Sequence, residues 1–401
     1  MEGVFRHRDF RLLLYGQAAS TIGDRIVFVA LALYVTELGS PSDVGIVLAC
    51  HAVPLVGFLL IGGVWADRLP RHKVVVATDL IRFALHALLA VLIFTGAVEI
   101  WHIALIEAAF GTAEAFFRPA YTGLVPQTVP EEQIQPAKAA FGTVETVAEF
   151  AGPALATALV LVVGPGFAFA IDAATFLVSA AFLVRLHPRE RGVAAERTTV
   201  LAELREGWSE VRSRDWIWVI VLVFSIGLLF GFGPYMTLGP TVSIERYDTA
   251  AIYGILASAM GAGTIAGAVI GFRWRPRRPM RTAMLLALPL PASFGAFALG
   301  LPPVVLFPVF VFAGTGIALF DIWWHTALAQ RVPPHMLSRV TSYDWMGSLA
   351  LLPIGYVLAG PLGESLGATE VLVAGSALAL VALTLTFTSR EVRRLRRLER
   401  V

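Results

Sequence analysis

The sequence predicts an all-α membrane protein in which twelve transmembrane helices form two six-helix bundles. Three observations predict this fold class: the composition, the number of long apolar segments and an internal repeat. Of the 401 residues, 57% are hydrophobic and only 15% are charged, and the mean hydropathy is +0.74. A soluble chain of this length needs many more charged residues to cover its surface, so the composition is typical of a polytopic membrane protein.

Twelve segments are apolar enough to cross a membrane as helices, since about 20 residues span the hydrocarbon core. In chain order they lie at about 10–36, 42–66, 74–97, 100–123, 139–163, 166–187, 215–239, 250–272, 280–300, 303–329, 340–361 and 367–388. The N-terminus has no small-residue cleavage site after a short apolar core, so we expect no removable signal peptide. The single cysteine, Cys50, excludes an internal disulfide.

The connections between these spans alternate in charge. Those after the odd-numbered spans are nearly free of Lys and Arg, whereas those after the even-numbered spans and both termini are basic, as in RLPRHK, RWRPRRPMR and SREVRRLRRLER. Basic loops stay on the cytoplasmic side of a membrane. The sequence therefore predicts a multi-pass protein of a bacterial cytoplasmic membrane with both termini in the cytoplasm, and the basic tail indicates contact with anionic lipid rather than with nucleic acid.

The two halves of the chain repeat short motifs at nearly the same interval. QTVP at 127–130 recurs as QRVP at 330–333, and GP at 152–153 recurs at 360–361. We therefore expect a duplicated unit, with an N-terminal bundle at 1–187, a cytoplasmic loop at 188–214, a C-terminal bundle at 215–389 and a basic tail at 390–401. Within the loop, the helical spacing of Leu201, Leu204, Trp208 and Val211 predicts an amphipathic helix.

The stretch GVWADRLPRHK between the second and third spans resembles a loop motif of the major facilitator superfamily, in which Gly63, Asp67, Arg68 and Arg71 occupy the motif positions. Pro70 stands where the motif has a second glycine. The resemblance covers the whole chain and implies the major facilitator fold. It also implies that Asp67 helps to close the cytoplasmic side, by facing the amide end of a helix in the other half, near Thr341.

Further stretches are similar to the macrolide-efflux and enterobactin-exporter branch of that superfamily. They include GDRIVFVALALYVTE in the first span and LAQRVPPHMLSRVTS after the tenth. In the fifth span, Gly152 and Pro153 match an element of drug antiporters, although Ala148 and Ala156 replace its outer glycines. The resemblance implies a proton-driven exporter that works by alternating access.

The first span carries a polar stripe on one helical face, which we expect to line water. It consists of Gln17, Ser20, Thr21 and Asp24. Ionisable groups inside spans are costly and usually face a cavity or a partner. Asp24 is therefore a candidate for proton coupling, the alternative being that it only stabilises packing, while Gln17 and Thr21 are candidates for the substrate cavity.

The fourth and fifth spans add further acids. Glu114 and Arg118 are one turn apart and can pair, whereas Glu107 has no such partner nearby in the sequence, so we expect it to be protonated or to face a cavity. On the fifth span, Glu145 and Glu149 share a face without a nearby cation. Burial of a carboxyl group without a cation favours its neutral form. The candidates for proton coupling on these two spans are Glu107, Glu114, Glu145 and Glu149. For Glu145, the alternative is a hydrated residue near the end of its span.

The second half carries fewer acids within its spans. Asp321 and His325 are one turn apart on the tenth span beside Trp324, and Tyr235 lies in the seventh. These four residues, with Arg118, are candidates for the substrate cavity. For His325 the alternative is a structural histidine, and Asp172 in the sixth span matches a pattern of the exporter branch with a possible structural role.

No phosphate-binding loop, zinc-ligand spacing or nucleophile motif is present in the sequence, which argues against an ATP-driven pump or an enzyme. We therefore expect no cofactor, no metal and no nucleic-acid partner, and a monomer that uses protons and a small-molecule substrate. The predicted function is proton-coupled export of amphipathic or apolar small molecules. The alternatives are a lysolipid or metabolite carrier of the same fold, and a membrane-embedded partner or sensor that does not transport.

Overall fold

The computed structural model describes residues 3–189, 200–333 and 336–396, and these residues form helices without a β-strand. The chain divides into two compact units, Met1–Ala194 and Ala195–Val401. Among the described residues, twelve helical segments are long and apolar enough to span a membrane. The predicted fold class, an all-α protein with twelve spans in two bundles, is therefore confirmed.

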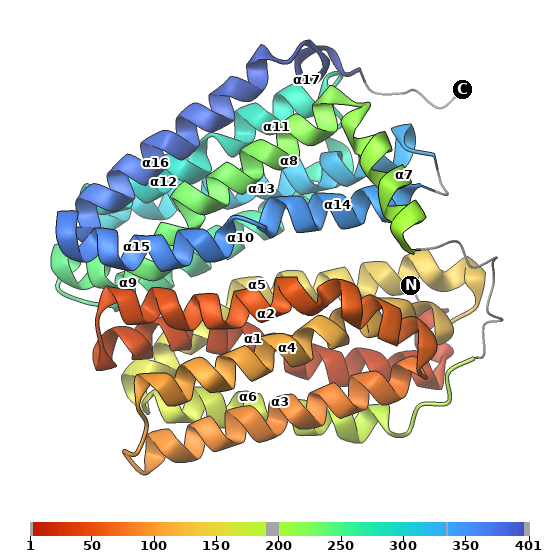
Figure 1. The fold of residues 1–401 in the computed structure, drawn as a ribbon, viewed down its shortest axis with the longest axis horizontal. Helices are drawn as coiled ribbons and strands as arrows, with labels where there is room; N and C mark the ends of the chain where they lie inside the picture. The colour runs from red at the N-terminus through yellow and green to blue at the C-terminus, as the bar shows by residue number, and fades with distance from the viewer. Residues whose placement is uncertain (1–2, 190–199, 334–335, 397–401) are drawn as a thin grey trace. The chain divides into compact units, whose positions relative to one another are not determined.

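Unit 1 contains six long helices that run side by side (Figure 1). They are α1 (Arg8–Leu38), α2 (Pro41–Arg68), α3 (Arg71–Phe94), α4 (Ile100–Leu124), α5 (Ile134–Val162) and α6 (Pro165–Leu183). Short turns separate them. The turn before α2 illustrates how a helix begins after such a turn. Ser40 and Asp43 form a reciprocal capping box, and Pro41 occupies the first helical position, where a missing N–H costs nothing.

Unit 2 contains the remaining spans, several of which are interrupted. Its elements are α7 (Val200–Arg212), α8 (Asp215–Gly227), a π-helical segment η4 (Leu228–Phe232), α9 (Gly233–Tyr247), α10 (Ala251–Arg273), α11 (Pro279–Ala287), α12 (Pro289–Ala298), α13 (Pro303–Arg331), α14 (Leu337–Leu349), α15 (Leu352–Leu366), α16 (Ala368–Leu385) and α17 (Arg390–Arg394). The seventh span thus comprises α8, η4 and α9, the ninth comprises α11 and α12, and the eleventh comprises α14 and α15.

The two units repeat the same helix pairings, although each is packed separately. In unit 1, α1 packs against α5 and α6, α3 packs against α4 and α6, and α2 packs against α4. In unit 2, the seventh span packs against the eleventh and twelfth, the ninth against the tenth and twelfth, and α10 against α13. Each of these pairings of unit 1 therefore recurs six spans later, which is what duplication of a six-helix unit produces.

Glycines allow the closest of these helix pairs to form. On α4, a Cβ at Gly111 would overlap the backbone of His51 on α2, and a Cβ at Gly62 of α2 would overlap the backbone of Ala115. In unit 2, Gly263 of α10 and Gly314 of α13 are in equally close backbone contact with the opposite helix. Small residues give such close approach in membranes, where apolar burial supplies little driving force between helices.

The predicted amphipathic helix at the centre of the chain corresponds in part to α7. Val211 is buried, whereas Trp208 is exposed and lies 5.7 Å, between ring centroids, from Tyr343 of α14. Residues 190–199 lie outside the described part of the chain, as do the side chains of Leu201 and Leu204.

Candidate functional site

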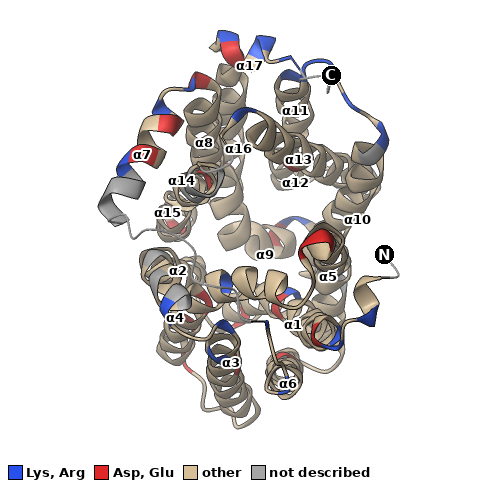
Figure 2. Cartoon of the chain, turned by 90° about the vertical axis from the view of Figure 1, so that its right-hand side faces the viewer, with Lys and Arg blue, Asp and Glu red and all other residues tan. Residues whose placement is uncertain are grey.

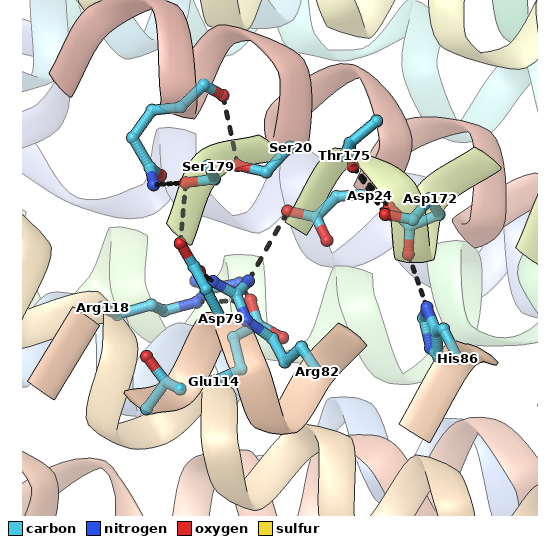
Figure 3. A network of polar contacts seen from close by, with 12 residues as sticks. Ser20, Asp24, Asp79, Arg82, His86, Glu114, Arg118, Asp172, Thr175 and Ser179 are labelled. Atoms are coloured by element: carbon cyan, nitrogen blue, oxygen red, sulfur yellow. Dashed lines mark hydrogen bonds and ion pairs between the residues drawn. The ribbon is translucent and has the colours of Figure 1, made fainter. Parts of the chain in front are cut away.

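A cluster of ionisable side chains fills the interior of unit 1, between five of its helices. Its cations and imidazoles are Arg82 and His86 of α3, His51 of α2 and Arg118 of α4, and its acids are Asp24 of α1, Asp79 of α3, Glu107 and Glu114 of α4 and Asp172 of α6. Figure 3 shows most of this cluster, with side chains from separate helices pointing toward one another. By contrast, the apolar helix α12 of unit 2 carries no charged residue (Figure 2).

Arg82 lies at the centre of one half of the cluster. Its Nη2 donates a hydrogen bond of 2.5 Å to Oδ1 of Asp79, and its Nη1 lies 3.9 Å from Oδ2 of Asp24. The guanidinium group also lies over two aromatic rings, 3.9 Å from the centroid of Phe117 and 4.3 Å from that of Phe176. Because Arg82 is only 1% exposed, this combination of carboxylates and ring faces takes the place of its lost hydration.

Hydrogen bonds extend this half of the cluster to α1 and α6. Ser179 of α6 donates to Oδ2 of Asp79 over 2.7 Å and accepts a bond of 3.0 Å from Nε2 of Gln17 on α1. Gln17 and Ser20 are both buried. The expectation that the stripe on α1 lines water is therefore wrong for these two residues, because they face the helices of their own bundle; Thr21 and Asp24 are half-buried.

The two histidines form the other half of the cluster. His51 lies between two acids of α4, with Nδ1 3.0 Å from Oε2 of Glu107 and Nε2 3.0 Å from Oε2 of Glu114. His86 likewise lies between two acids, with Nδ1 2.5 Å from Oδ2 of Asp172 and Nε2 3.5 Å from Oε1 of Glu107. Each imidazole thus presents both ring nitrogens to carboxyl groups.

Local packing explains how one imidazole can reach two acids on the same helix. Glu107 and Glu114 lie two turns apart on one face of α4, about 10 Å along the axis. Gly111 lies between them, where α2 approaches most closely at His51. The His86 ring is stacked on Phe110 at 4.2 Å between centroids, which fixes its plane. On α1, Gly23 leaves the space that the carboxyl group of Asp172 occupies.

The end of this half of the cluster at Asp172 and His86 is more deeply buried than the end at His51 and Arg118. The side chain of Asp172 is 0% exposed and that of His86 is 1% exposed, whereas His51 is 26% exposed and Arg118 is 45% exposed. Arg118 pairs with Glu114 through two bonds, of 2.8 Å from Nε and 2.6 Å from Nη2. The predicted Glu114–Arg118 pair is therefore present, and it forms the more exposed end of the chain.

The cluster contains more acids than fixed cations. Five carboxyl groups share two guanidinium groups and two imidazoles. Burying unbalanced charge in a medium of low dielectric is costly. The cluster becomes neutral when it holds three protons, two on the imidazoles and one on a carboxyl group, so its charge depends on proton binding.

Two expectations about acids in unit 1 need correction. Glu107 has no partner nearby in the sequence and is expected to be protonated or to face a cavity, but it is buried and contacts both imidazoles, which come from α2 and α3 and therefore cannot be found by looking along α4. Glu149 was expected to lie far from any cation, but its Oε1 accepts a bond of 2.9 Å from Nη2 of Arg25 on α1. Gly152 makes that pair possible, because it brings α5 against the backbone of Arg25. Glu145 lies one turn before Glu149 and is exposed, and Pro153 lies inside α5.

The candidates in unit 2 lie in two different settings. Asp321 and His325 are paired over 3.3 Å on α13, and both side chains are largely exposed. Trp324 is buried and donates a bond of 2.8 Å to Oδ2 of Asp344. Tyr235 is 0% exposed and stacked on Phe294 at 4.3 Å, so it belongs to the aromatic core of unit 2; the expectation that its ring lines a cavity is wrong.

The loop motif lies between α2 and α3. Gly63 is within α2, Arg68 ends that helix and is exposed, and Arg71 begins α3, where its Nη1 donates a bond of 2.8 Å to the carbonyl of Gly123 on α4. The side chain of Asp67 lies outside the described part of the structure. Its expected role in closing the cytoplasmic side therefore stays a prediction.

Sequence reasoning identified Asp24, Glu107, Glu114 and Arg118 but missed His51, His86, Asp79 and Arg82. A signal for three of the missed residues is present in the third span. Asp79, Arg82 and His86 are spaced three and four residues apart, which places them on one helical face within an apolar segment. The spacing of His51 gives no such signal, since it is isolated in the second span.

Comparisons with known proteins agree with the fold and the span count. Residues 13–352 match the model of the Major Facilitator Superfamily. The chain is 24% identical to macrolide efflux protein A of Streptococcus pyogenes, covering 97% of this chain and 99% of that protein. It is 27% identical to the multidrug efflux pump Tap of Mycolicibacterium fortuitum, with 89% of each chain covered.

A solved structure supports the same fold. A bacterial homologue of the human lysosomal transporter Spinster, in an inward-facing and unoccupied conformation, superposes with a TM-score of 0.73, covering 98% of this chain and 99% of that chain at 16% identity. At such low identity, the likeness concerns the fold alone. Because the family model matches most of the chain and the helix arrangement agrees, this protein is a member of the Major Facilitator Superfamily.

Proposed function

We propose that this transporter exports amphipathic or apolar small molecules from a bacterial cytoplasm and takes up protons in exchange. The observation that carries the proposal is the buried cluster of unit 1, in which five carboxyl groups share two guanidinium groups. A protein that only has to fold would gain stability by replacing such a cluster with apolar residues. Retained ionisable groups inside spans usually serve transport, which also argues against a non-transporting partner or sensor.

The named relatives support export as the direction. Macrolide efflux protein A and the multidrug efflux pump Tap are similar to this chain over most of its length. A proton gradient supplies enough energy, because each charge that moves down about 100 mV releases about 2.3 kcal/mol. That energy sustains more than a tenfold concentration ratio of substrate for each proton.

Resistance of living cells tests this proposal. Expression in a bacterium that lacks its own efflux pumps should raise the erythromycin concentration needed to stop growth at least fourfold, and a protonophore should remove the difference. A panel with a cationic dye and a lipophilic antibiotic covers other members of the proposed substrate class. If no compound in the panel loses potency and the cells instead accumulate a nutrient faster, the chain imports rather than exports.

The motif between α2 and α3 has a second proposed role within the same function. We propose that Asp67 helps to close the cytoplasmic side, with Arg68 and Arg71 holding the loop at the membrane surface. Asp67→Asn keeps the side-chain volume and should lower efflux at least fivefold at normal expression, whereas Asp43→Asn in the cap of α2 should not. Unchanged efflux by Asp67→Asn would reduce the motif to an orientation signal.

A further inference from the structure

The two histidines of the buried cluster join three acids into one continuous chain. From its outer to its inner end, the chain passes from Glu114 (17% exposed) through His51 (26%), Glu107 (3%) and His86 (1%) to Asp172 (0%). Acids and imidazoles alternate along it, so that every imidazole nitrogen faces a carboxyl oxygen. An imidazole in this position can accept a proton at one nitrogen and release another proton from the other nitrogen.

We propose that His51 and His86 relay protons between Glu114, at the more exposed end of this chain of acids and imidazoles, and Asp172, at its buried end. This inference rests on the proposed proton-coupled function and assigns its pathway. In the first step, the carboxyl group of Glu114 gives a proton to Nε2 of His51, while Nδ1 of His51 gives its proton to Glu107. In the second step, the carboxyl group of Glu107 rotates so that the oxygen protonated by His51 faces His86; it then protonates Nε2 of His86, and Nδ1 of His86 gives its proton to Asp172. The number of protons is unchanged in each step.

One contact in this chain, the junction between Glu107 and His86, is longer than a normal hydrogen bond. Nε2 of His86 and Oε1 of Glu107 lie 3.5 Å apart, and both atoms are fully buried without a hydrogen-bond partner among the described residues. Buried polar atoms without a hydrogen-bond partner are destabilising. These two atoms face each other, so a shift of about half an ångström would join them by a normal hydrogen bond. The junction therefore divides the relay into an outer segment with Glu114 and His51 and an inner segment with His86 and Asp172.

The charged groups around the relay determine where a proton rests. Arg118 holds Glu114 from the same helix, and Cys50 precedes His51 on α2. On the inner side, Arg82 lies one turn before His86 on α3, where it pairs with Asp79 and lies 3.9 Å from Oδ2 of Asp24 on α1. Movement of Arg118 away from Glu114 would free that carboxyl group to take up a proton, whereas Asp172, whose side chain is 0% exposed, remains shielded from solvent.

Transport by purified protein in vesicles provides the first test. His51→Gln keeps a polar side chain between Glu107 and Glu114 but cannot carry a proton, so efflux of erythromycin driven by a pH gradient should fall at least tenfold. Exchange of labelled for unlabelled erythromycin, which needs no net proton movement, should stay within twofold of the wild-type rate. His86→Gln should behave in the same way. The control His102→Gln, at the start of α4 and outside the cluster, should match the wild type in both assays.

A spectroscopic measurement tests the relay without any substrate. With ¹⁵N-labelled histidine, the ring signals of His51 and His86 can be assigned from the variants that lack them. Because Glu107 contacts both rings, Glu107→Gln should change the titration of both signals, while the His102 signal stays unchanged. Asp172→Asn should change the His86 titration more than that of His51.

The outcomes distinguish failure of the relay from failure of the proposed function. If His51→Gln still pumps erythromycin at the wild-type rate in a pH gradient, the relay is wrong even though the transporter is proton-coupled. If the wild type shows no gradient-driven efflux of erythromycin, the proposed function fails for this substrate, and the histidine titrations decide about the relay. A Glu107→Gln variant that leaves either histidine signal unaffected would then refute it. Where a Gln variant does not fold, His51→Asn provides the same comparison.

Discussion

Asp24 is held less tightly than the other acids of the buried cluster. Its Oδ2 lies 3.9 Å from Arg82, whereas Asp79 accepts a direct hydrogen bond from the same guanidinium group, and the Asp24 side chain is 39% exposed. Of the three protons that would make the cluster neutral, the two imidazoles can hold two. Asp24 is the carboxyl group best placed to hold the third, since it has the weakest contact with a cation and the easiest access to solvent.

Replacement of this acid should uncouple transport. Asp24→Asn removes one proton site and leaves Arg82 with its main partner, Asp79, so we expect normal folding and at least a tenfold loss of efflux driven by a pH gradient. Exchange of substrate at equal pH should persist. The control Glu37→Gln, near the end of the same helix, should retain gradient-driven efflux. If Asp24→Asn retains it as well, the third proton lies elsewhere in the cluster.

Among the individual residues of the cluster, the sequence predicts some and not others. Acids inside apolar segments stand out individually, so Asp24, Glu107 and Glu114 could be identified, and Arg118 followed from its spacing to Glu114. His51 could not be identified, because its role depends on the close contact of α2 with α4. The ion pair between Arg25 and Glu149 also joins residues far apart in the chain. Contacts between helices decide these cases, and periodicity within one helix does not reveal them.

Among the elements, the pair of helices α2 and α4 positions the outer segment of the relay. Gly62 contacts the backbone of Ala115, while a Cβ at Gly57, five residues earlier on α2, would meet open space. The two glycines therefore allow a matched comparison on one helix. An added methyl group at Gly62 has to push α4 away, and overpacking of this kind typically costs about 1–3 kcal/mol.

Thermal unfolding in detergent would measure this difference. Gly62→Ala should lower the midpoint of unfolding by several degrees and reduce gradient-driven efflux, because separation of α2 from α4 also lengthens the contacts of His51. Gly57→Ala should leave the midpoint unchanged or raise it slightly, since alanine favours a helix over glycine. Equal effects of the two substitutions would mean that the close contact at Gly62 does not determine the packing of this pair.

The interruptions within spans of unit 2 were not expected from hydropathy. The ninth span breaks at Leu288 before Pro289, the eleventh breaks at Ala350 and Leu351, and the seventh contains a π-helical segment at Leu228–Phe232. Hydropathy averages over about 20 residues, so it detects a span but not a change of helical register within it. Pro289 is a local signal for the first break, since proline cannot donate the helical hydrogen bond at its position.

For the whole molecule, the arrangement of basic loops predicts orientation in the membrane. The connections after the even-numbered spans and both termini are basic, so they should face the cytoplasm. Reporter fusions at Pro41, Gly164 and Gly363 should therefore be external, and fusions at Thr199 and at the C-terminus internal. A fusion at Gly164 that is internal would contradict the orientation.

The two units share a duplicated fold but differ in the ionisable residues that they carry. Both repeat the same main helix pairings, yet the buried chain of acids and imidazoles lies in unit 1, while in unit 2 Asp321 forms a more exposed pair with His325 and Asp344 accepts a bond from Trp324. We infer that unit 1 carries the proton pathway. Charge-neutralising substitutions in unit 1 should therefore impair gradient-driven transport more than Asp321→Asn does.

The most direct test of the central claim, that proton movement drives export, is simultaneous measurement of protons and erythromycin in vesicles that contain only this protein. A pH-sensitive dye inside the vesicles reports proton movement, and labelled erythromycin reports substrate movement. Erythromycin is a weak base that crosses the membrane unaided, so the signals from protein-free vesicles are subtracted. We predict that an imposed erythromycin gradient moves protons in the opposite direction, and that Asp24→Asn abolishes this proton movement. Erythromycin transport by the protein without any accompanying proton movement would contradict the account.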